Sequence, residues 1–248
     1  MNFKSYFEKI LPILFWLIVW VLVSKIINQV LYFPSPLVTL KALGQLMVNK
    51  NFFISIFSTV SRVFIGLVLA NVLGILLGLV CGLEKWAFDL MRPMMTFIRS
   101  TPVMSLIIIA LIWFQSNHVP IFISFLMCFP IIWTNIVEGF KKVDQDLIEM
   151  GKIYQISRMK LVKDIYIPSL LPFYIAGFNN ALGIAWKVTV AAEVLSHPRF
   201  AIGTNLHDSK VYLDTPSLFA WTLVIVILSF FFEIVITNYL EAKLKKYY

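Results

Sequence analysis

Polar residues that could carry chemistry are sparse, and several gather in one stretch that holds Glu193, His197, His207 and Asp208. Glu193 and His197 stand at positions i and i+4, a spacing at which two side chains on one helix share a metal ion. Pro198 disfavours helix at this point, so the pair is not expected to form. Solvated loop residues are the simpler interpretation of this stretch.

Other catalytic signatures are missing from the sequence. Cys81 and Cys128 lie inside apolar runs, with no Cys or His at metal-binding spacing, and are interpreted as small core residues. The chain has no Ser-His-Asp arrangement with a plausible base, no His-Glu-x-x-His motif and no glycine-rich phosphate-binding loop. We therefore expect a non-catalytic chain that binds no metal or other cofactor itself.

Ionisable residues inside apolar runs form a second group of candidates, because burying a charge in a bilayer is costly. Lys187 follows Trp186, with Asn179 about two turns earlier. A lysine facing a central path would favour an anionic solute, whereas the alternative is that it extends to the outer headgroups. Arg99 precedes Pro102, which frees a backbone carbonyl, and it either lines an inner vestibule or anchors the helix at the interface.

Three further charges in these runs have simpler interpretations. Glu193 closes the run of Lys187 and is a candidate for the same path, but six positions separate the two, so they lie on different helix faces. Arg62, near the end of an earlier run, is expected to extend to the headgroups. Glu138 is expected to pair with Lys142 at the i,i+4 spacing.

The elements that must position these residues are predicted from composition. Of 248 residues, 60% are hydrophobic and 14% are charged, whereas soluble domains carry roughly 45–50% apolar and about 25% charged residues. This composition excludes intrinsic disorder and argues against a soluble enzyme. A helix needs about 20 mostly apolar residues to cross a bilayer. We predict a single all-α domain over residues 1–248, with six spans at about 11–31, 56–82, 94–115, 119–139, 171–195 and 217–240.

Basic residues predict the orientation of these spans. With the N-terminus inside, 13 of the 21 Lys and Arg residues fall in inside segments and four in outside segments. The positive-inside rule then places both termini of this multi-pass chain in the cytoplasm. The net charge of +8 therefore needs no nucleic acid to explain it.

Small residues recur every four positions along the second predicted span and mark one helix face. In lipid, such a face lets two backbones approach closely. Packing within the chain is the simpler interpretation, and a dimer or pore-lining contact is the alternative. The residues are Gly66, Ala70, Gly74, Gly78 and Gly82.

The longest predicted cytoplasmic segment, residues 140–170, is amphipathic. Acidic residues precede basic ones, and an apolar stripe runs between them, which predicts one or two short helices that end at Pro168 and Pro172. The segment is either a helix that lies on the membrane surface or a docking element for a soluble partner.

Residues 149–172 read EMGKIYQISRMKLVKDIYIPSLLP. They resemble the signature loop of binding-protein-dependent ABC importer permeases, which reads E-A-A, three residues, G, nine residues, then I-x-L-P. The resemblance extends to the permeases of sulfonate, taurine and nitrate importers through Phe33-Pro34-Ser35-Pro36, Phe129-Pro130 and Ala185-Trp186. Single matches in the same subfamily include Thr59, Arg62, Gly66, Gly74, Gly78, Glu193 and Gly203.

The resemblance implies a type I importer permease of the bacterial cytoplasmic membrane, a non-catalytic subunit that supplies half of a translocation path. Two copies are expected to form a homodimer, and each would dock one of two ABC ATPase subunits, which bind the ATP and Mg²⁺. An extracytoplasmic solute-binding protein would deliver the solute, expected to be a small anion, with a thiamine precursor or another small metabolite as alternatives. The residues implied in ATPase docking are Glu149, Gly151, Gln155, Ser157, Arg158, Ile165 and Pro168.

Gln155 stands where the family pattern has glycine. Glycine would allow a positive φ between the two short helices. Glutamine must use a right-handed bend or accept a strain of about 1 kcal/mol or more.

Two rival classes fit the sequence less well. An ion-coupled secondary transporter usually has an internal repeat and ligands for a coupling ion, and no repeat relates the two halves of this chain. An intramembrane enzyme would need paired Asp, a Ser/His pair or a metal motif within the spans, and none is present.

Overall fold

The computed structural model describes the backbone of residues 3–244, and the side chains of residues 11–240 except Gln145, Lys152 and Arg158. This part of the chain is helical and contains no strand. A single turn of π-helix, Val162–Tyr166, joins α8 to α9. The α-helices are α1 Phe3–Ile27, α2 Pro36–Met47, α3 Lys50–Leu83, α4 Lys85–Ser100, α5 Val103–Trp113, α6 Val119–Lys141, α7 Gln145–Ile153, α8 Arg158–Leu161, α9 Ile167–Ser196, α10 Ile202–Val211 and α11 Thr215–Leu244.

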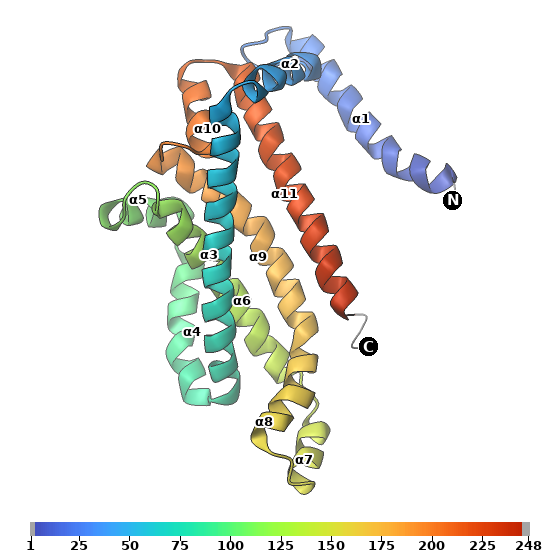
Figure 1. The fold of residues 1–248 in the computed structure, drawn as a ribbon, viewed down its shortest axis with the longest axis vertical. Coiled ribbons are helices and arrows are strands. Elements are labelled where there is room, and N and C mark those ends of the chain that lie inside the picture. Colours follow the sequence, from blue (N-terminus) through green and yellow to red (C-terminus); the bar gives the residue numbers. More distant parts are fainter. Residues whose placement is uncertain (1–2, 245–248) are drawn as a thin grey trace.

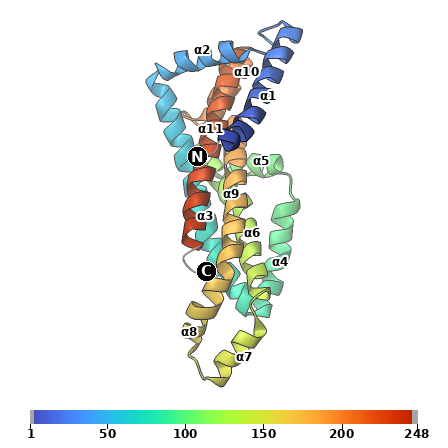
Figure 2. The same ribbon diagram turned by 90° about the vertical axis from the view of Figure 1, so that its right-hand side faces the viewer.

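Long helices α3, α6, α9 and α11 run along the long axis of the molecule (Figure 1). The short helices α7 and α8 project beyond them at one end, and α2 and α10 lie at the opposite end (Figures 1 and 2). Among the described residues, four helical segments are long and apolar enough to cross a membrane: Lys50–Leu83, Val119–Lys141, Met159–Ser196 and Thr215–Leu240. The prediction of an all-α chain built on long apolar helices is confirmed.

The third predicted span, residues 94–115, is not one continuous helix. The chain bends by 103° between α4 and α5. Thr101 is extended, with φ −81° and ψ 130°, because Pro102 disfavours the helical conformation in the residue before it. If the bent pair is counted as one span, the described chain has up to five.

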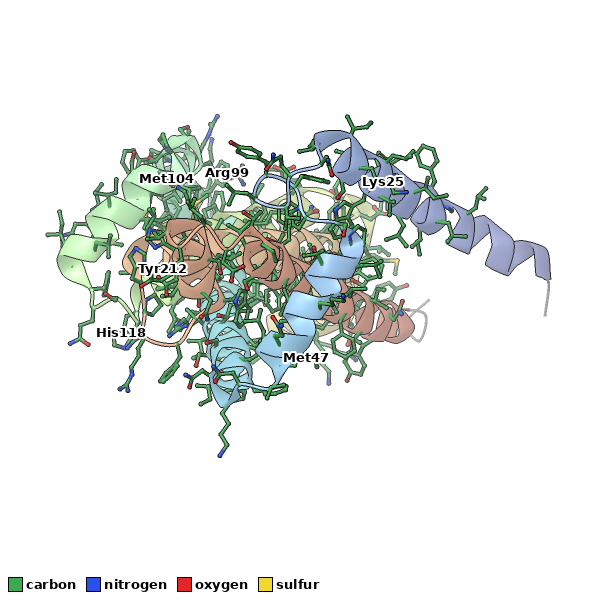
Figure 3. The ribbon with its side chains drawn as sticks, turned by 90° about the horizontal axis from the view of Figure 1, so that it is seen from above. Lys25, Met47, Arg99, Met104, His118 and Tyr212 are labelled. Atoms are coloured by element: carbon green, nitrogen blue, oxygen red, sulfur yellow. The ribbon has the colours of Figure 1, made fainter. Side chains whose placement is uncertain are left out.

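Helix α1 lies apart from the bundle and is held at its C-terminal end. The Trp20 indole donates to the Pro34 carbonyl at 3.0 Å, and Phe33 packs edge-on against Phe219 of α11. Figure 3 shows α1, which carries Lys25, extending away from the other helices. Its apolar part, Leu11–Ile27, is shorter than the four long segments, so the first span stays a prediction.

The glycine face of α3 packs against α6 of the same chain. A Cβ atom on Gly74 would lie 2.8 Å from the Ile132 Cβ, and one on Gly78 would lie 2.8 Å from the Ile136 Cβ. Gly66 meets Ser124 in the same way, and Gly82 meets Phe140. The partner is always 58 positions later, so α3 and α6 run parallel in fixed register and approach closely where α3 has no side chain. Ala70, in the same row, is fully buried.

Helices α2 and α10, which the sequence analysis did not predict, lie at one end of the bundle, and α2 runs across it (Figure 2). The start of α2 has local signals, because the Ser35 hydroxyl accepts a hydrogen bond from the Val38 amide and Pro36 occupies the first turn. The start of α10 has none: Ala201 is its N-cap and makes no side-chain cap. Its first amides are held by residues of other helices.

Candidate functional site

Helices α7 and α8 form a hairpin at one end of the molecule, and Gln155 lies at its turn. Gln155 has φ +52°, in the left-handed region. The Ile156 amide reaches back to the Gly151 carbonyl at 2.9 Å, and the Tyr154 amide donates to the Met150 carbonyl at 3.0 Å. This is the usual helix ending with a left-handed residue just past the C-cap, a position where glycine carries no steric penalty. Of the two conformations expected for Gln155, a right-handed bend or a strained left-handed one, the structure shows the left-handed one.

The hairpin is closed by a tight contact between its two arms. A Cβ atom on Gly151 would lie 2.7 Å from the Leu161 Cδ1, so the Leu161 side chain would have to move to admit any larger residue. Ile165 and Pro168 are half-buried behind this contact, whereas Glu149 and Ser157 are exposed. The side chain of Arg158 lies outside the described residues. The hairpin therefore places Glu149, Gly151, Gln155 and Ser157 on one compact projection.

The sequence analysis predicted that the second arm ends at Pro168 and Pro172, and this prediction was wrong. Helix continues from Met159 to Ser196, through the π-turn and into α9. Proline has no amide hydrogen, so Pro168 cannot donate to the carbonyl four residues earlier. The wider π-turn lies directly before it, with the Ile167 amide bonded to the Val162 carbonyl, and Pro168 falls in the first turn of α9, where proline is tolerated.

Apolar side chains cover the exposed surface of the hairpin. Ile153, Tyr154 and Met159 are 77%, 73% and 82% exposed, respectively. Leu147, Met150 and Ile156 are also exposed. Exposed apolar side chains gathered on one hairpin, together with charged residues such as Glu149, are typical of a site that another protein covers.

At the opposite end of the bundle, Arg62 of α3 and Glu193 of α9 form a buried ion pair of 2.8 Å. The Glu193 side chain is fully buried, and that of Arg62 is 11% exposed. The Thr59 hydroxyl lies 3.0 and 2.9 Å from the two carboxylate oxygens of Glu193. The guanidinium also donates to the Phe200 carbonyl at 2.8 Å and to the Asn117 side chain at 3.3 Å.

This cluster of Thr59, Arg62 and Glu193, which we call the latch, also holds the start of α10. The Ile202 amide donates to the Thr59 hydroxyl and the Gly203 amide to the Glu193 carboxylate, both at 3.0 Å. A carboxylate at the first turn of a helix satisfies free amides and interacts well with the helix dipole. A Cβ atom on Gly203 would lie 2.4 Å from the Glu193 Cβ, so only glycine fits. The latch thus joins α3, α9 and α10.

Two expectations from the sequence fail at the latch. Arg62 does not extend to headgroups, because its guanidinium is turned inward and fully engaged by the Glu193 carboxylate and the Phe200 carbonyl. Glu193 does not line an exposed face, and Trp186 is also buried, at 1% exposure. The signal that could have found the pair is its placement: opposite charges near the same end of two spans must pair when both are buried.

Helices α9 and α11 share a groove of about 360 Å³ that is lined by both Lys187 and Glu233. Both side chains are exposed, and no ion pair joins them in the described part of the chain. One helix turn or more further along, the Thr237 hydroxyl donates to the Asn179 side chain at 3.1 Å. Of the candidate path residues, Lys187 and Asn179 therefore lie along one seam between α9 and α11.

Arg99 lies elsewhere, at the end of α4 next to the bend at Pro102. Its guanidinium donates to the Pro130 carbonyl of α6 at 3.1 Å and contacts the Thr134 hydroxyl. Arg99 is exposed. Nearby, Glu138 pairs with Lys141 at 2.8 Å, at the i,i+3 spacing instead of the expected contact with Lys142.

The histidines of the α9–α10 segment form no metal-binding group. The His197 and His207 rings lie edge to face, 4.1 Å apart. Helix α9 ends at Ser196, and His197 follows in the left-handed region, so it does not continue the helix from Glu193. Among the described residues there is no group of three His, Cys, Asp or Glu side chains that could hold a metal ion.

Similarity to known proteins identifies the family of this chain. Residues 70–246 match the family model of the binding-protein-dependent transport system inner membrane component. The chain belongs to this family. It is therefore the membrane-embedded permease component of a binding-protein-dependent transport system, and the resemblance of its 149–172 segment to that family is confirmed.

The names of relatives of this permease agree with the family. A probable ABC transporter permease protein of Brucella melitensis is 28% identical over 81% of this chain and 81% of its own length. A nitrate import permease protein of Synechococcus elongatus is 30% identical over 75% of this chain and 69% of its own length. A bicarbonate transport system permease protein of Synechocystis is 31% identical over 65% of this chain and 58% of its own.

The fold of the permease is found in a solved transporter. A chain of the MetNI methionine ABC transporter, seen in inward-facing conformations, superimposes with a TM-score of 0.63. The match covers 77% of this permease and 95% of the MetNI chain at 13% sequence identity. The helix bundle therefore has the same fold as this MetNI chain.

Proposed function

We propose that this permease is the membrane subunit of an ATP-driven importer and that it docks its ATPase through the α7–α8 hairpin. The observation that carries the proposal is the hairpin itself. It projects beyond the long helices and presents exposed Ile153, Tyr154 and Met159 (Figure 1). Exposed apolar side chains are unfavourable in water, and a partner surface that buries them stabilises the complex. Glu149 adds a charge through which the partner is selected.

The hairpin end is the cytoplasmic end in this proposal. Basic side chains at that end include Lys85, Lys141, Lys142 and Lys163, and the excess of Lys and Arg marks the cytoplasmic side. Both termini then lie in the cytoplasm. Helices α2 and α10, at the opposite end, face the extracytoplasmic binding protein, and the latch fixes α10 for that contact.

Half of the translocation path lies on the exposed face of α9. Asn180, Gly183 and Lys187 occupy this face at helical spacing, and nothing lies within 4 Å of the position that a Gly183 Cβ would take. A lysine and an asparagine facing hydrocarbon would be costly, so the face requires water or protein. A second copy of the permease supplies the other half of the path in a homodimer, and two ATPase subunits bind the ATP and Mg²⁺.

The cargo in this proposal is a small anion. Relatives of the permease carry nitrate and bicarbonate in their names. Lys187 is a cation on the proposed path, and a fixed positive charge in a dry or narrow passage favours an anionic solute. Sulfonate, taurine and nitrate-like solutes belong to this class, and a thiamine precursor or another small metabolite is the alternative. Uptake assays with the matching binding protein distinguish them.

Co-purification tests the proposal directly. The wild-type chain, solubilised in a mild detergent from its own cells, is expected to retain a stoichiometric ATPase subunit. Glu149→Arg is expected to lose it, because the reversed charge lies on the hairpin surface. Lys210→Glu, an exposed charge reversal on α10 at the other end, is the matched control and is expected to keep the ATPase. Wild type that retains no ATPase would support the ion-coupled alternative instead.

A further inference from the structure

A groove between α4 and α6, close to the hairpin end, is lined by three cationic side chains. Arg92 and Arg99 come from α4 and Lys141 from α6, and the volume of the groove is about 360 Å³. Thr96 completes the stripe on α4, since positions 92, 96 and 99 follow one helix face. This volume falls in the range of small-ligand pockets in proteins.

Positive charge in the groove exceeds the negative charge available to it. Glu138 is the one acidic residue among the lining side chains, and it pairs with Lys141 at 2.8 Å. Arg99 donates to oxygen atoms that carry no charge, on Pro130 and Thr134. Arg92 has no ion pair in the described part of the chain. Two guanidinium groups thus lack a counterion, and guanidinium pairs most strongly with oxyanions, through two parallel hydrogen bonds.

A neutral donor in the wall of the groove is also unsatisfied. Trp133 lines the groove, is 4% exposed, and its indole Nε1 has no hydrogen-bond partner. Its ring stacks on Phe88 at 5.8 Å, and the Lys141 ammonium lies 5.2 Å from the Phe88 ring centre. The nitrogen is itself buried, so this donor lies behind the groove wall and an occupant of the groove does not reach it.

We propose that the α4–α6 groove binds an oxyanion, either the phosphate of an anionic phospholipid or a free inorganic anion. The same chemistry recognises both: two guanidinium groups and an ammonium around negatively charged oxygen atoms. Basic pockets between membrane helices commonly hold anionic headgroups, which makes the lipid a natural source. The site is independent of the proposed transport function, since it rests only on the groove.

Thermal unfolding of the purified full-length chain tests the proposal and separates the two sources. One arm compares mixed micelles that contain phosphatidylglycerol with micelles that contain phosphatidylcholine, and native mass spectrometry counts the retained lipid. The other arm compares sodium phosphate and sodium nitrate with sodium chloride at equal ionic strength. Stabilisation in the first arm identifies a lipid phosphate, and stabilisation in the second identifies a free oxyanion.

Variants link the effect to the groove. Arg92→Gln with Lys141→Gln is expected to weaken the apparent affinity for the stabilising anion at least about tenfold, since two charge-assisted contacts are lost. Trp133→Phe, which removes only a donor buried behind the wall, is expected to leave it within about twofold. Lys142→Gln with Lys163→Gln removes the same charge from side chains outside the groove and is expected to leave the affinity within about twofold. Equal losses in both double variants, or no dependence on any of these anions, would overturn the proposal.

Discussion

The Arg62–Glu193 latch gives the sharpest test of how the outer end of the permease is held. Arg62→Met leaves a carboxylate that is fully buried without its cation, and Glu193→Gln leaves a guanidinium that is 11% exposed without its anion. Removing one partner of a buried ion pair costs about 3–5 kcal/mol. For a chain of this length each kcal/mol lowers the unfolding temperature by roughly 2–4 °C, so each single variant is expected to lose roughly 6–20 °C.

The double variant separates the ion pair from the other contacts. With Arg62→Met and Glu193→Gln combined, neither charge is left unpaired, and the glutamine oxygen still accepts from the Gly203 amide. The loss is then limited to hydrogen bonds worth about 1 kcal/mol each. We expect the double variant to be more stable than either single variant, or at least far more stable than additivity predicts.

Tryptophan fluorescence of the detergent-solubilised chain during heating measures these changes. Limited proteolysis adds a local readout, because loss of the latch is expected to expose the segment between α9 and α10, residues 197–201. Glu138→Gln is the matched control, since its pair with Lys141 is half-exposed and such pairs contribute at most about 1 kcal/mol. Single variants that match this control, or a double variant equal to the sum of the singles, would refute the reasoning.

Three further predictions concern packing, the hairpin and the path. Gly78→Ala would place a Cβ 2.8 Å from the Ile136 Cβ and is expected to lower the free energy of unfolding by about 1–3 kcal/mol. Gly44→Ala is the control and is expected to be neutral or stabilising, because no atom of the described residues lies within 4 Å of that position. Equal effects of the two variants on thermal unfolding would contradict the packing of α3 against α6. Gln155→Gly, at φ +52°, is expected to stabilise the chain by about 1 kcal/mol and to keep ATPase coupling, and lost coupling would count against this account of the turn. Lys187→Gln is expected to lower anion uptake in proteoliposomes at least about tenfold while Lys187→Arg retains most of it, and unchanged uptake in Lys187→Gln would exclude this lysine from the path.

Long apolar helices and the glycine row were predictable from sequence because each depends on local spacing. Gly74 and Gly78 repeat at one helix face, and a backbone contact in lipid needs small residues there. The partner of that face was not predictable, since the choice between α6 and a second chain depends on the register of two segments 58 positions apart. The bend at Pro102 was signalled by the proline, but its angle depends on the packing of α5.

The latch illustrates a different limit. Thr59, Arg62 and Glu193 were each recognised as family-like positions, yet their meeting depends on how α3 and α9 pack over more than 130 residues of separation. Local rules assigned Arg62 to the headgroups, because a lone arginine near a helix end usually extends there. A rule that pairs opposite charges at the same membrane depth would have corrected this. Helix α10 escaped prediction for the same reason, since its cap comes from other helices.

Photo-crosslinking from two tyrosine positions tests the central claim most directly. A photoreactive residue replaces Tyr154 on the hairpin or Tyr212 at the opposite end, which are 73% and 81% exposed (Figure 3 labels Tyr212). In membranes of the native cell, the account predicts that Tyr154 crosslinks to an ATPase subunit and that Tyr212 never does. An ATPase captured from Tyr212, or only lipid captured from Tyr154, would contradict it.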